Sequence, residues 1–487
     1  MFAFFLSSGL FLGWSLGAND ASNVFGTAVG TRMIRFRTAA ICCAVFIVLG
    51  AVIGGAGTSA TLGKLGGINA IAGAFVVALA AGAGVYLMTK AGYPVSTSQT
   101  IVGAIIGWNV FSGSLTDYHS LTKIVSTWVA CPILSAAISI VLYKLVSVSI
   151  RTFKPHMFHL DALTRYALLV VGAFGSYSLG ANNIANVMGV FLPVAPFPEI
   201  SLFGWLVISP AQQLFFIGGL AIATGVLTYS RHVMMTVGEG IMRLSPVAAF
   251  VVVSAHSLVL FLFSSEGVNQ WLTGYGLPAI PLVPVSSSQA IVGAVIGIGL
   301  LKGGRAVQWR VLRGISIGWV VTPLIAGIIS FVALFFFQNV FNQQTYRQVS
   351  YSLTRQALDR IGRADIDAGR LSDMTNEAYL DAVTFRRALD ARIRLAWEQR
   401  DFVMESAKVD ELTISKEKIE SITTDGRISK AQTDAIRMLE GRIFVHPWLL
   451  DEALAHLSPE WRMTAGDEES NRKIAEQLTY LYSLFRD

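Results

Sequence analysis

Two short polar motifs lie inside long apolar segments, and the residue types of the first suit a cation site. It reads Gly17-Ala18-Asn19-Asp20-Ala21-Ser22-Asn23. Asn19 and Asn23 are four residues apart, so on a helix they share a face beside Asp20. Carboxylate, amide and carbonyl oxygens together form a hard-ligand site for a small cation. We expect the glycines to break the helix and expose backbone carbonyls to a cavity. The alternative is polar contact between close-packed helices.

The second motif, Pro94-Val95-Ser96-Thr97-Ser98-Gln99, predicts a helix N-terminus that can bind an anion. Ser96 followed three residues later by Gln99 has the spacing of a capping box, so we expect a helix to begin here, inside an apolar segment. Free backbone N–H groups at a helix start, flanked by hydroxyls, attract anions. The alternative is a plain helix start at a re-entrant turn.

Both motifs occur twice and in the same order. The first returns as Gly180-Ala181-Asn182-Asn183 followed by Asn186, a shift of 163 residues, and the second returns as Pro284-Val285-Ser286-Ser287-Ser288-Gln289, a shift of 190. Inverted repeats with interrupted helices are typical of secondary transporters, whose site lies near the membrane midplane. The two serine motifs are therefore expected to face one another. The alternative is a coincidental duplication of helix-packing sequence.

The elements that position these motifs must cross a lipid bilayer. Only 14% of the 487 residues are charged and 53% are hydrophobic, whereas soluble proteins average about 25% charged residues. Residues 1–340 hold 16 Lys and Arg and 6 Asp and Glu, while residues 341–487 hold 21 and 25. The composition excludes an ordinary soluble enzyme and gives no sign of nucleic-acid binding, and the cysteines lack the spacing of a metal site or disulfide framework.

The apolar runs predict an all-α membrane protein of about 10–12 membrane segments. Ten runs approach the length of a span: 2–30, 38–57, 68–89, 98–112, 121–147, 163–190, 211–229, 246–264, 288–301 and 313–338. Alternating loops carry fourteen basic residues on one side and two on the other. The positive-inside rule then places loops 31–37, 148–165, 230–243 and 302–313 in the cytoplasm and both chain ends outside the cell. We allow a half-helix over 200–209.

Five crossings in each half require the second repeat to be inverted. We therefore predict a first repeat with its cytoplasmic linker over 1–165, a second repeat over 166–340, and a soluble helical domain over 341–487 on the extracytoplasmic face of the cell (inner) membrane. In this tail Leu380, Phe385, Leu389, Ile393 and Trp397 approximate one helical stripe, while Gly426 and the His446-Pro447 step indicate breaks between helices. Regulation, oligomerisation and partner docking stay open as its role, as does homodimer formation.

These motifs resemble those of a known family. GANDASNVFGTAVG resembles the signature of the PiT family of inorganic phosphate transporters, GANNIANVMG resembles its second copy, and PVSTSQ and PVSSSQ look like its paired hairpin tips, over about residues 5–338. The resemblance implies a phosphate importer coupled to Na⁺ or H⁺ with no other cofactor. The implied substrate-binding residues are Asp20, Asn23, Ser96, Thr97, Ser98, Gln99, Asn186, Ser286, Ser287, Ser288 and Gln289. The cation-binding set is Asn19, Asp20, Asn23, Asn182, Asn183 and Asn186, with transported Na⁺ at Asp20 and Asn23.

One departure leaves alternatives open. The family usually has an aspartate in both copies, and here Asn183 stands in the second. This leaves Na⁺ or H⁺ as the coupling ion, with Na⁺ favoured, and it opens a sulfate permease as an alternative. Asp20 favours phosphate, because a protonated phosphate can donate a hydrogen bond to a carboxylate and sulfate cannot. An anion channel is the alternative from another class. His256 is either a proton carrier or, as we expect, bonded to a backbone carbonyl.

Overall fold

The computed structural model describes residues 2–90, 95–195, 197, 200–202, 206–234, 242, 244–304, 307–375, 377–423, 428–464 and 468–486. The chain forms two compact units. The first, the membrane unit, comprises Met1–Ser112 and Thr116–Arg347. The second, the tail unit, comprises Gly113–Leu115 and Gln348–Asp487.

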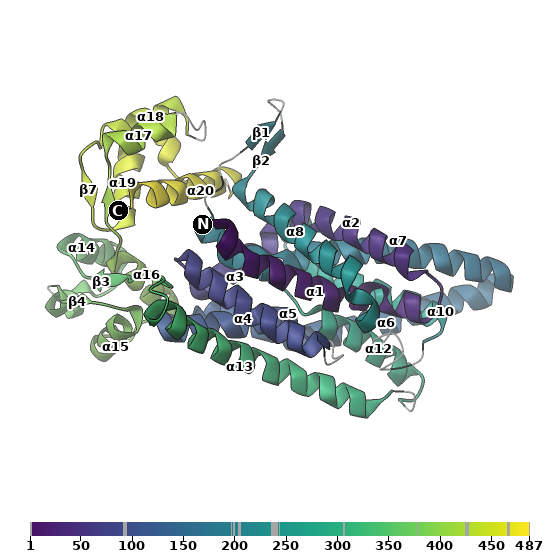
Figure 1. Ribbon diagram of the computed structural model, residues 1–487. Coiled ribbons are helices and arrows are strands. Elements are labelled where there is room, and N and C mark those ends of the chain that lie inside the picture. Colours follow the sequence, from purple (N-terminus) through teal and green to yellow (C-terminus); the bar gives the residue numbers. More distant parts are fainter. Residues whose placement is uncertain are drawn as a thin grey trace. The chain divides into compact units, whose positions relative to one another are not determined.

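The membrane unit is a bundle of long helices with a small β-hairpin (Figure 1). Eight helices in the described part of the chain are long and apolar enough to span a membrane, so the protein is a multi-pass membrane protein. The elements are α1 (Phe2–Gly30), α2 (Phe36–Gly54), α3 (Ala56–Gly66), α4 (Ile71–Lys90), α5 (Thr97–Ser112), α6 (Tyr118–Phe153), α7 (Met157–Met188), η1 (Gly189–Val194), β1 (Ile200–Leu202), β2 (Leu206–Ile208), α8 (Pro210–Thr228), α10 (Pro246–Ser264), α11 (Glu266–Gly274), α12 (Ser287–Leu301) and α13 (Trp309–Asn339).

Each of the ten apolar runs contains a helix, but two of these helices are short. The helices α5 and α12 have 16 and 15 residues, or about 24 and 22 Å, against a hydrocarbon thickness of about 30 Å. They begin at buried residues inside the bundle, as the serine motifs predict. The half-helix allowed over 200–209 is wrong: Ile200 pairs with Ile208 in an antiparallel hairpin, whose β-branched residues favour strands.

The predicted helix break in the asparagine motifs is also wrong. Both α1 and α7 run continuously through their motifs. The motif glycines instead allow two backbones to touch, since a Cβ atom on Gly17 would lie 1.9 Å from the carbonyl oxygen of Ile222 in α8. Its counterpart Gly180 has the same relation to Ile47 in α2, at 2.1 Å.

The two repeats interlock, because other helices also pack on helices of the opposite repeat. A Cβ on Gly103 in α5 would lie 2.1 Å from the carbonyl oxygen of Pro323 in α13. The equivalent Gly293 in α12 has the same relation to Pro132 in α6, at 2.2 Å. Equivalent residues thus make equivalent contacts across the two halves, as an internal twofold symmetry requires.

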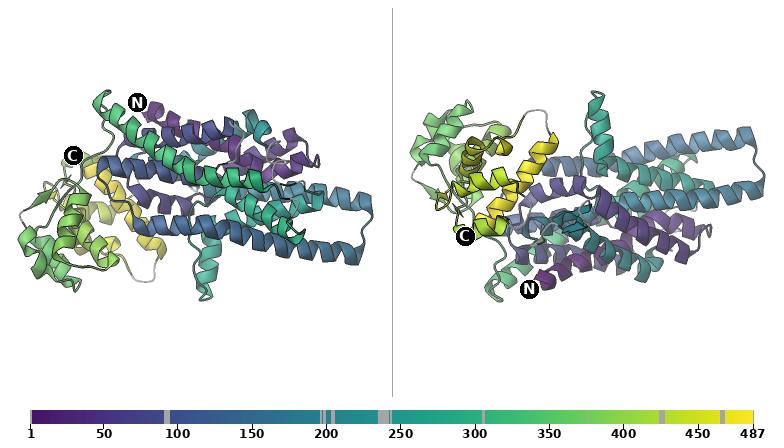
Figure 2. Two further views of the ribbon diagram at one scale, coloured as in Figure 1. Left: turned by 90° about the horizontal axis from the view of Figure 1, so that it is seen from below. Right: turned by 90° about the horizontal axis from the view of Figure 1, so that it is seen from above.

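The membrane unit begins and ends at the same end of the bundle. The ring of Phe75, near the start of α4, lies 5.8 Å from Phe5 in α1 and 5.3 Å from Phe337 near the end of α13. At the other end, α6 and α7 extend together beyond the neighbouring helices in both views of Figure 2. The orientation of the bundle in the membrane stays a prediction from the basic residues of the loops. Two of these residues, Arg243 and Arg305, lie outside the described residues.

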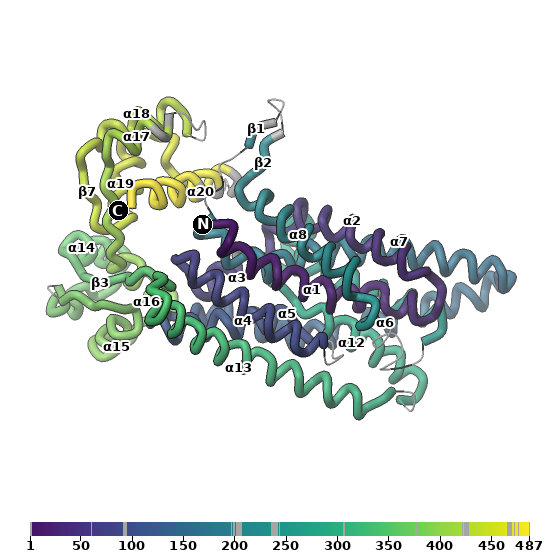
Figure 3. The backbone as a smooth tube through the Cα atoms, viewed as in Figure 1, coloured from purple at the N-terminus to yellow at the C-terminus, as the bar shows by residue number. Residues whose placement is uncertain are grey.

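The tail unit consists of short helices, which can be followed in Figure 3, and small sheets. Its strands form a three-stranded sheet in the order β4-β3-β5 and a pair β6-β7. The elements are β3 (Ser350–Ser352), α14 (Arg355–Arg363), η2 (Ala368–Met374), β4 (Ala378–Tyr379), α15 (Ala382–Arg392), α16 (Trp397–Ala407), β5 (Lys408–Val409), β6 (Leu412–Thr413), α17 (Lys416–Thr423), α18 (Lys430–Arg437), β7 (Ile443–Phe444), α19 (Pro447–Leu457), η3 (Pro459–Trp461) and α20 (Glu468–Phe485).

The predicted apolar stripe in the tail does not lie on one helix. Phe385 and Leu389 are buried in α15, but that helix ends at Arg392, and Leu380 before it is 65% exposed. The predicted stripe continues past the end of α15 to α16, because no Gly or Pro marks the break between these two helices in the sequence. The His446-Pro447 step does precede α19, as predicted, and Gly426 lies outside the described residues.

Candidate functional site

The asparagine motifs of the two repeats meet at the centre of the membrane unit. Asp20 and Asn183 occupy equivalent positions, and the Asn183 Nδ2 donates a hydrogen bond to the Asp20 Oδ2 at 3.3 Å. Contact between equivalent residues places this pair on the internal twofold axis. Asp20 is the one buried carboxylate in the described part of the membrane unit, and no lysine or arginine is buried there.

Each asparagine motif bonds to the serine motif of the opposite repeat. The Asn23 Nδ2 donates to the Ser287 hydroxyl at 3.1 Å, and the Asn186 Nδ2 donates to the Ser98 hydroxyl at 2.8 Å. The serine motifs also touch directly, since the Ser98 Oγ donates to the carbonyl oxygen of Val285 at 3.1 Å. The structure therefore brings all four predicted motifs together.

The short helices begin at the serine motifs. The hydroxyl oxygens of Ser96 and Ser286 accept hydrogen bonds from the backbone N–H groups of Gln99 and Gln289, both at 3.2 Å. A full capping box also needs the glutamine side chain to accept from the backbone N–H of the serine, and this bond is absent at both described serines. The side-chain Oε1 atoms of Gln99 and Gln289 have no hydrogen-bond partner among the described residues. Both glutamine carbonyls thus stay available to a ligand. Pro94, the first residue of the first serine motif, lies outside the described residues.

Other acceptor oxygens near the axis are also buried without a partner. Among the described residues none donates a hydrogen bond to the Oδ1 atoms of Asp20, Asn23, Asn182 and Asn186. Buried polar atoms are normally paired, so a cluster of unpaired carbonyl and carboxylate oxygens favours bound cations or water. The Thr97 hydroxyl, at the start of α5, is likewise buried and unpaired within the described part of the chain.

Asn19 and Asn182, a second equivalent pair, hold the segments that lead into the short helices. The Asn19 side chain donates to the Thr89 hydroxyl at 2.8 Å and accepts from the Val95 backbone N–H at 3.4 Å. The Asn182 Nδ2 donates to the carbonyl oxygen of Val283 at 3.4 Å. Both side chains therefore tie an asparagine motif to the segment that enters the short helix of its own repeat.

Reasoning from the sequence missed the partner of His256. Its Nε2 lies 2.9 Å from the Ser287 hydroxyl, so the expected bond to a backbone carbonyl is wrong. The signal was present, since this is an imidazole within an apolar helix, but the sequence does not show that α10 packs beside the start of α12.

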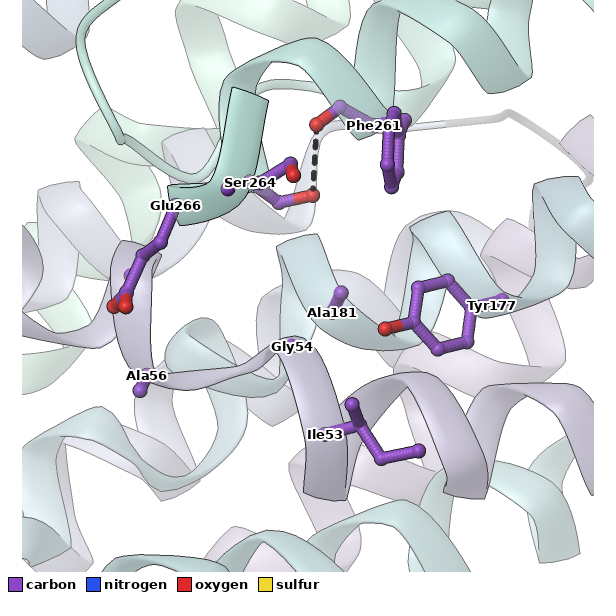
Figure 4. Close-up of a pocket in the computed structure, with 11 residues that line it drawn as sticks. Ile53, Gly54, Ala56, Tyr177, Ala181, Phe261, Ser264 and Glu266 are labelled. Atoms are coloured by element: carbon purple, nitrogen blue, oxygen red, sulfur yellow. Dashed lines mark hydrogen bonds between the residues drawn. The ribbon is translucent and has the colours of Figure 1, made fainter. Parts of the chain in front are cut away.

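A cavity of about 200 Å³ lies next to this site (Figure 4). It is lined by Gly54 and Ala56 at the junction of α2 and α3, by Tyr177 in α7 and by Glu266 in α11. Ala181, the neighbour of Asn182, also lines it. The cavity touches none of the predicted binding side chains, so it adjoins the site without being part of it.

The chain matches a known protein family and several named proteins. The model of the "Phosphate transporter family" matches residues 16–330 and 280–357. A protein of Thermococcus kodakarensis that bears the name of a phosphate permease is 28% identical over 400 residues, covering 66% of this chain and 94% of its own. The chloroplastic inorganic phosphate transporter 2-1 of Arabidopsis thaliana is 23% identical over 437 residues, covering 68% and 71%.

One solved structure has the same fold. It is described as "The sodium-dependent phosphate transporter", with a TM-score of 0.53 and 23% identity, and the match covers 69% of this chain and 99% of the other. The family match ends at residue 357, so the tail unit lies almost entirely beyond it. The resemblance of the motifs is confirmed: this chain belongs to the phosphate transporter family and is a membrane transporter, not an enzyme.

Proposed function

We propose that the protein is a secondary active importer of inorganic phosphate, driven by a cation gradient, with Na⁺ favoured over H⁺. The observation that carries the proposal is the crosswise pairing of Asn23 with Ser287 and of Asn186 with Ser98, around the axial Asp20. This pairing joins both helix N-termini and the buried carboxylate in one site, to which both repeats contribute.

The anion is held by neutral donors. The first turns of α5 and α12 supply backbone N–H groups, and Ser96, Thr97, Ser98, Ser286, Ser287 and Ser288 supply hydroxyls. Asp20 repels a fully deprotonated anion but accepts a hydrogen bond from a protonated phosphate oxygen. Phosphate fits this combination of donors and one carboxylate better than sulfate does, because sulfate has no proton at neutral pH.

The cation is held by the unpaired oxygens. The Oδ1 atoms of Asp20 and Asn23 are the first ligands we assign to Na⁺, with those of Asn182 and Asn186 on the other side of the axis. Asn183 completes the set, although its Oδ1 also accepts a hydrogen bond from Asn186 at 3.0 Å. Oxygen ligands of this kind suit a hard cation. The likeness to a protein described as a sodium-dependent phosphate transporter supports Na⁺.

The burial of the site supports alternating access. Each of its side chains is at most 3% exposed, so the anion site is closed to both ends of the bundle, whereas a channel needs a continuous pore. Rocking of the repeat over 1–165 against that over 166–340 would open it to one side at a time. From the positive-inside rule we further propose that the domain over 341–487 lies on the extracytoplasmic face.

Uptake into proteoliposomes tests the proposal. We expect labelled phosphate to accumulate above equilibrium under an inward Na⁺ gradient, weakly or not at all under a proton gradient alone, and labelled sulfate not to accumulate. The Ser230→Ala variant is a matched control, since among the described residues that buried hydroxyl bonds to the carbonyl of Val226 in α8, at 2.6 Å, and to none of the site residues. Sulfate accumulation would favour the sulfate permease, and purely downhill flux would favour a channel.

A further inference from the structure

His256 belongs to neither pair of motifs, yet it bonds directly to the anion site. It lies on α10, is fully buried, and places its Nε2 atom 2.9 Å from the hydroxyl of Ser287, the first residue of α12. Its other ring nitrogen, Nδ1, is buried and has no hydrogen-bond partner among the described residues. Those residues include no carboxylate within ion-pair distance of the ring.

These partners, together with a bound anion, decide which ring nitrogen carries the proton. A neutral imidazole has one N–H donor and one acceptor nitrogen. With the proton on Nδ1, the Ser287 hydroxyl donates to Nε2, and the buried Nδ1–H has no acceptor among the described residues. With the proton on Nε2, the ring donates to the Ser287 oxygen, and the Ser287 O–H needs an acceptor from a ligand. An oxyanion bound at Ser287 supplies that acceptor, so in the bound state the proton resides on Nε2 and His256 donates a hydrogen bond to the Ser287 oxygen.

The Ser287 oxygen then has no lone pair left. It accepts one hydrogen bond from the ring of His256 and a second from the Asn23 Nδ2 at 3.1 Å. A hydroxyl offers two lone pairs and one proton. With both lone pairs occupied, the proton can only be donated onward, and the described residues offer it no acceptor.

We propose that His256 is a positioning residue that turns the Ser287 hydroxyl into an obligate donor to the transported oxyanion. The inference rests on the proposed function, since the acceptor it requires is an anion bound at the serine motifs. The imidazole itself does not touch the anion and adds no charge. Its effect is to fix the direction of one hydroxyl proton toward the bound anion.

The other repeat lacks this device, which makes the two sides of the anion site unequal. The position equivalent to Ser287 is Thr97, whose hydroxyl has no hydrogen-bond partner among the described residues. The Thr97 hydroxyl is therefore free to rotate and can donate or accept. The anion consequently meets one fixed donor, from the second repeat, and one adaptable hydroxyl, from the first.

Phosphate uptake by purified variants in proteoliposomes tests the inference. His256→Leu removes the donor, and we expect the KM for phosphate to rise roughly three- to tenfold, the cost of immobilising one group on binding, with little change in kcat. His256→Gln places an amide N–H near the position of Nε2 and should restore most of the affinity. His256→Asn, whose amide is too short to reach Ser287, should behave as His256→Leu does and replaces it if that variant does not fold.

A double-variant cycle shows whether His256 acts through Ser287. In the Ser287→Ala background, His256→Leu should leave the KM unchanged, because no hydroxyl remains to be oriented. Equal KM values for Leu and Gln at this position, or a multiplicative effect in the Ser287→Ala background, would overturn the inference. If the wild-type protein transported sulfate instead of phosphate, only the proposed substrate would be refuted. The KM of each His256 variant, and of His256→Leu in the Ser287→Ala background, would then be measured for sulfate.

Discussion

Restoring a second carboxylate on the internal axis should add a positive charge to each transport cycle. In Asn183→Asp the Nδ2 that now lies 3.3 Å from the Asp20 Oδ2 becomes a carboxylate oxygen, so a hydrogen bond becomes a contact between two negative charges. At an effective dielectric constant of about 20, two unit charges at this distance repel by about 5 kcal/mol. That energy corresponds to more than a thousandfold preference for a cation between them.

The assay is the Na⁺ dependence of phosphate uptake, with the charge moved per phosphate recorded in the same proteoliposomes. We expect Asn183→Asp to move about one more positive charge per phosphate than wild type and to show a steeper Na⁺ dependence. Asp20→Asn should abolish coupled uptake, since it removes the one buried carboxylate in the described part of the membrane unit while preserving the side-chain shape.

The double variant Asp20→Asn with Asn183→Asp is the matched control. It keeps a single carboxylate on the axis and only moves it to the other repeat, with the hydrogen bond between the two side chains reversed. We expect it to recover coupled uptake at the wild-type charge per phosphate. If Asn183→Asp kept the wild-type Na⁺ dependence and Asp20→Asn kept full coupling, the axial pair would not be the cation site.

Three further outcomes are expected. The Ser96→Ala and Ser98→Ala double variant should weaken apparent phosphate affinity, each lost hydrogen bond to a charged group costing roughly 1.5–3 kcal/mol. Gly17→Ala should lower the thermal midpoint and the folded yield, because its Cβ would lie 1.9 Å from a backbone oxygen of α8, whereas Gly63→Ala in α3, with nothing within 4 Å, should not. A cysteine at Met438, which is 68% exposed, should react with an impermeant maleimide in intact cells, as an extracytoplasmic tail requires.

Each of these expectations has a contrary result. Unchanged phosphate affinity in the serine double variant would remove the hydroxyls of the first serine motif from the anion site. Equal thermal midpoints for the two glycine variants would argue against close packing of α1 on α8. Labelling of the cysteine only after permeabilisation would place the tail in the cytoplasm. The tail's Ser458, polar and therefore a candidate for the cysteine on sequence grounds, is only 5% exposed and is unsuitable for labelling.

The sequence predicts most of the membrane unit because lipid leaves few choices. A long apolar run must be a helix, and Ser96 and Ser286 mark helix starts through local chemistry alone. The predicted helix break at the motif glycines is wrong because glycine has two structural roles. It can interrupt a helix, or it can let a neighbouring backbone pack closely against one. Only the position of Ile222 against Gly17 decides between them, and that contact joins residues about 200 positions apart.

The partner of His256 is hidden from the sequence for the same reason. A buried histidine in an apolar run needs some partner, but whether this is a carbonyl or a hydroxyl depends on how α10 lies against α12. In the tail, the sequence does not mark where a helix ends. Its helices are short and exposed on one side, so the apolar period continued by chance from Phe385 and Leu389 across the end of α15 to Trp397.

The axial pair explains why this chain can lack the second aspartate of its family. Residues on an internal twofold axis contact their own equivalents, so two aspartates there would repel strongly whenever no cation lay between them. Asn183 replaces that repulsion with a donated hydrogen bond and keeps the Asp20 carboxylate in place without a cation. It also binds Asn186 through its Oδ1 at 3.0 Å, and Asn186 in turn bonds to Ser98. The substitution thus links the carboxylate to the anion site by a continuous set of hydrogen bonds, at the expense of one negative charge.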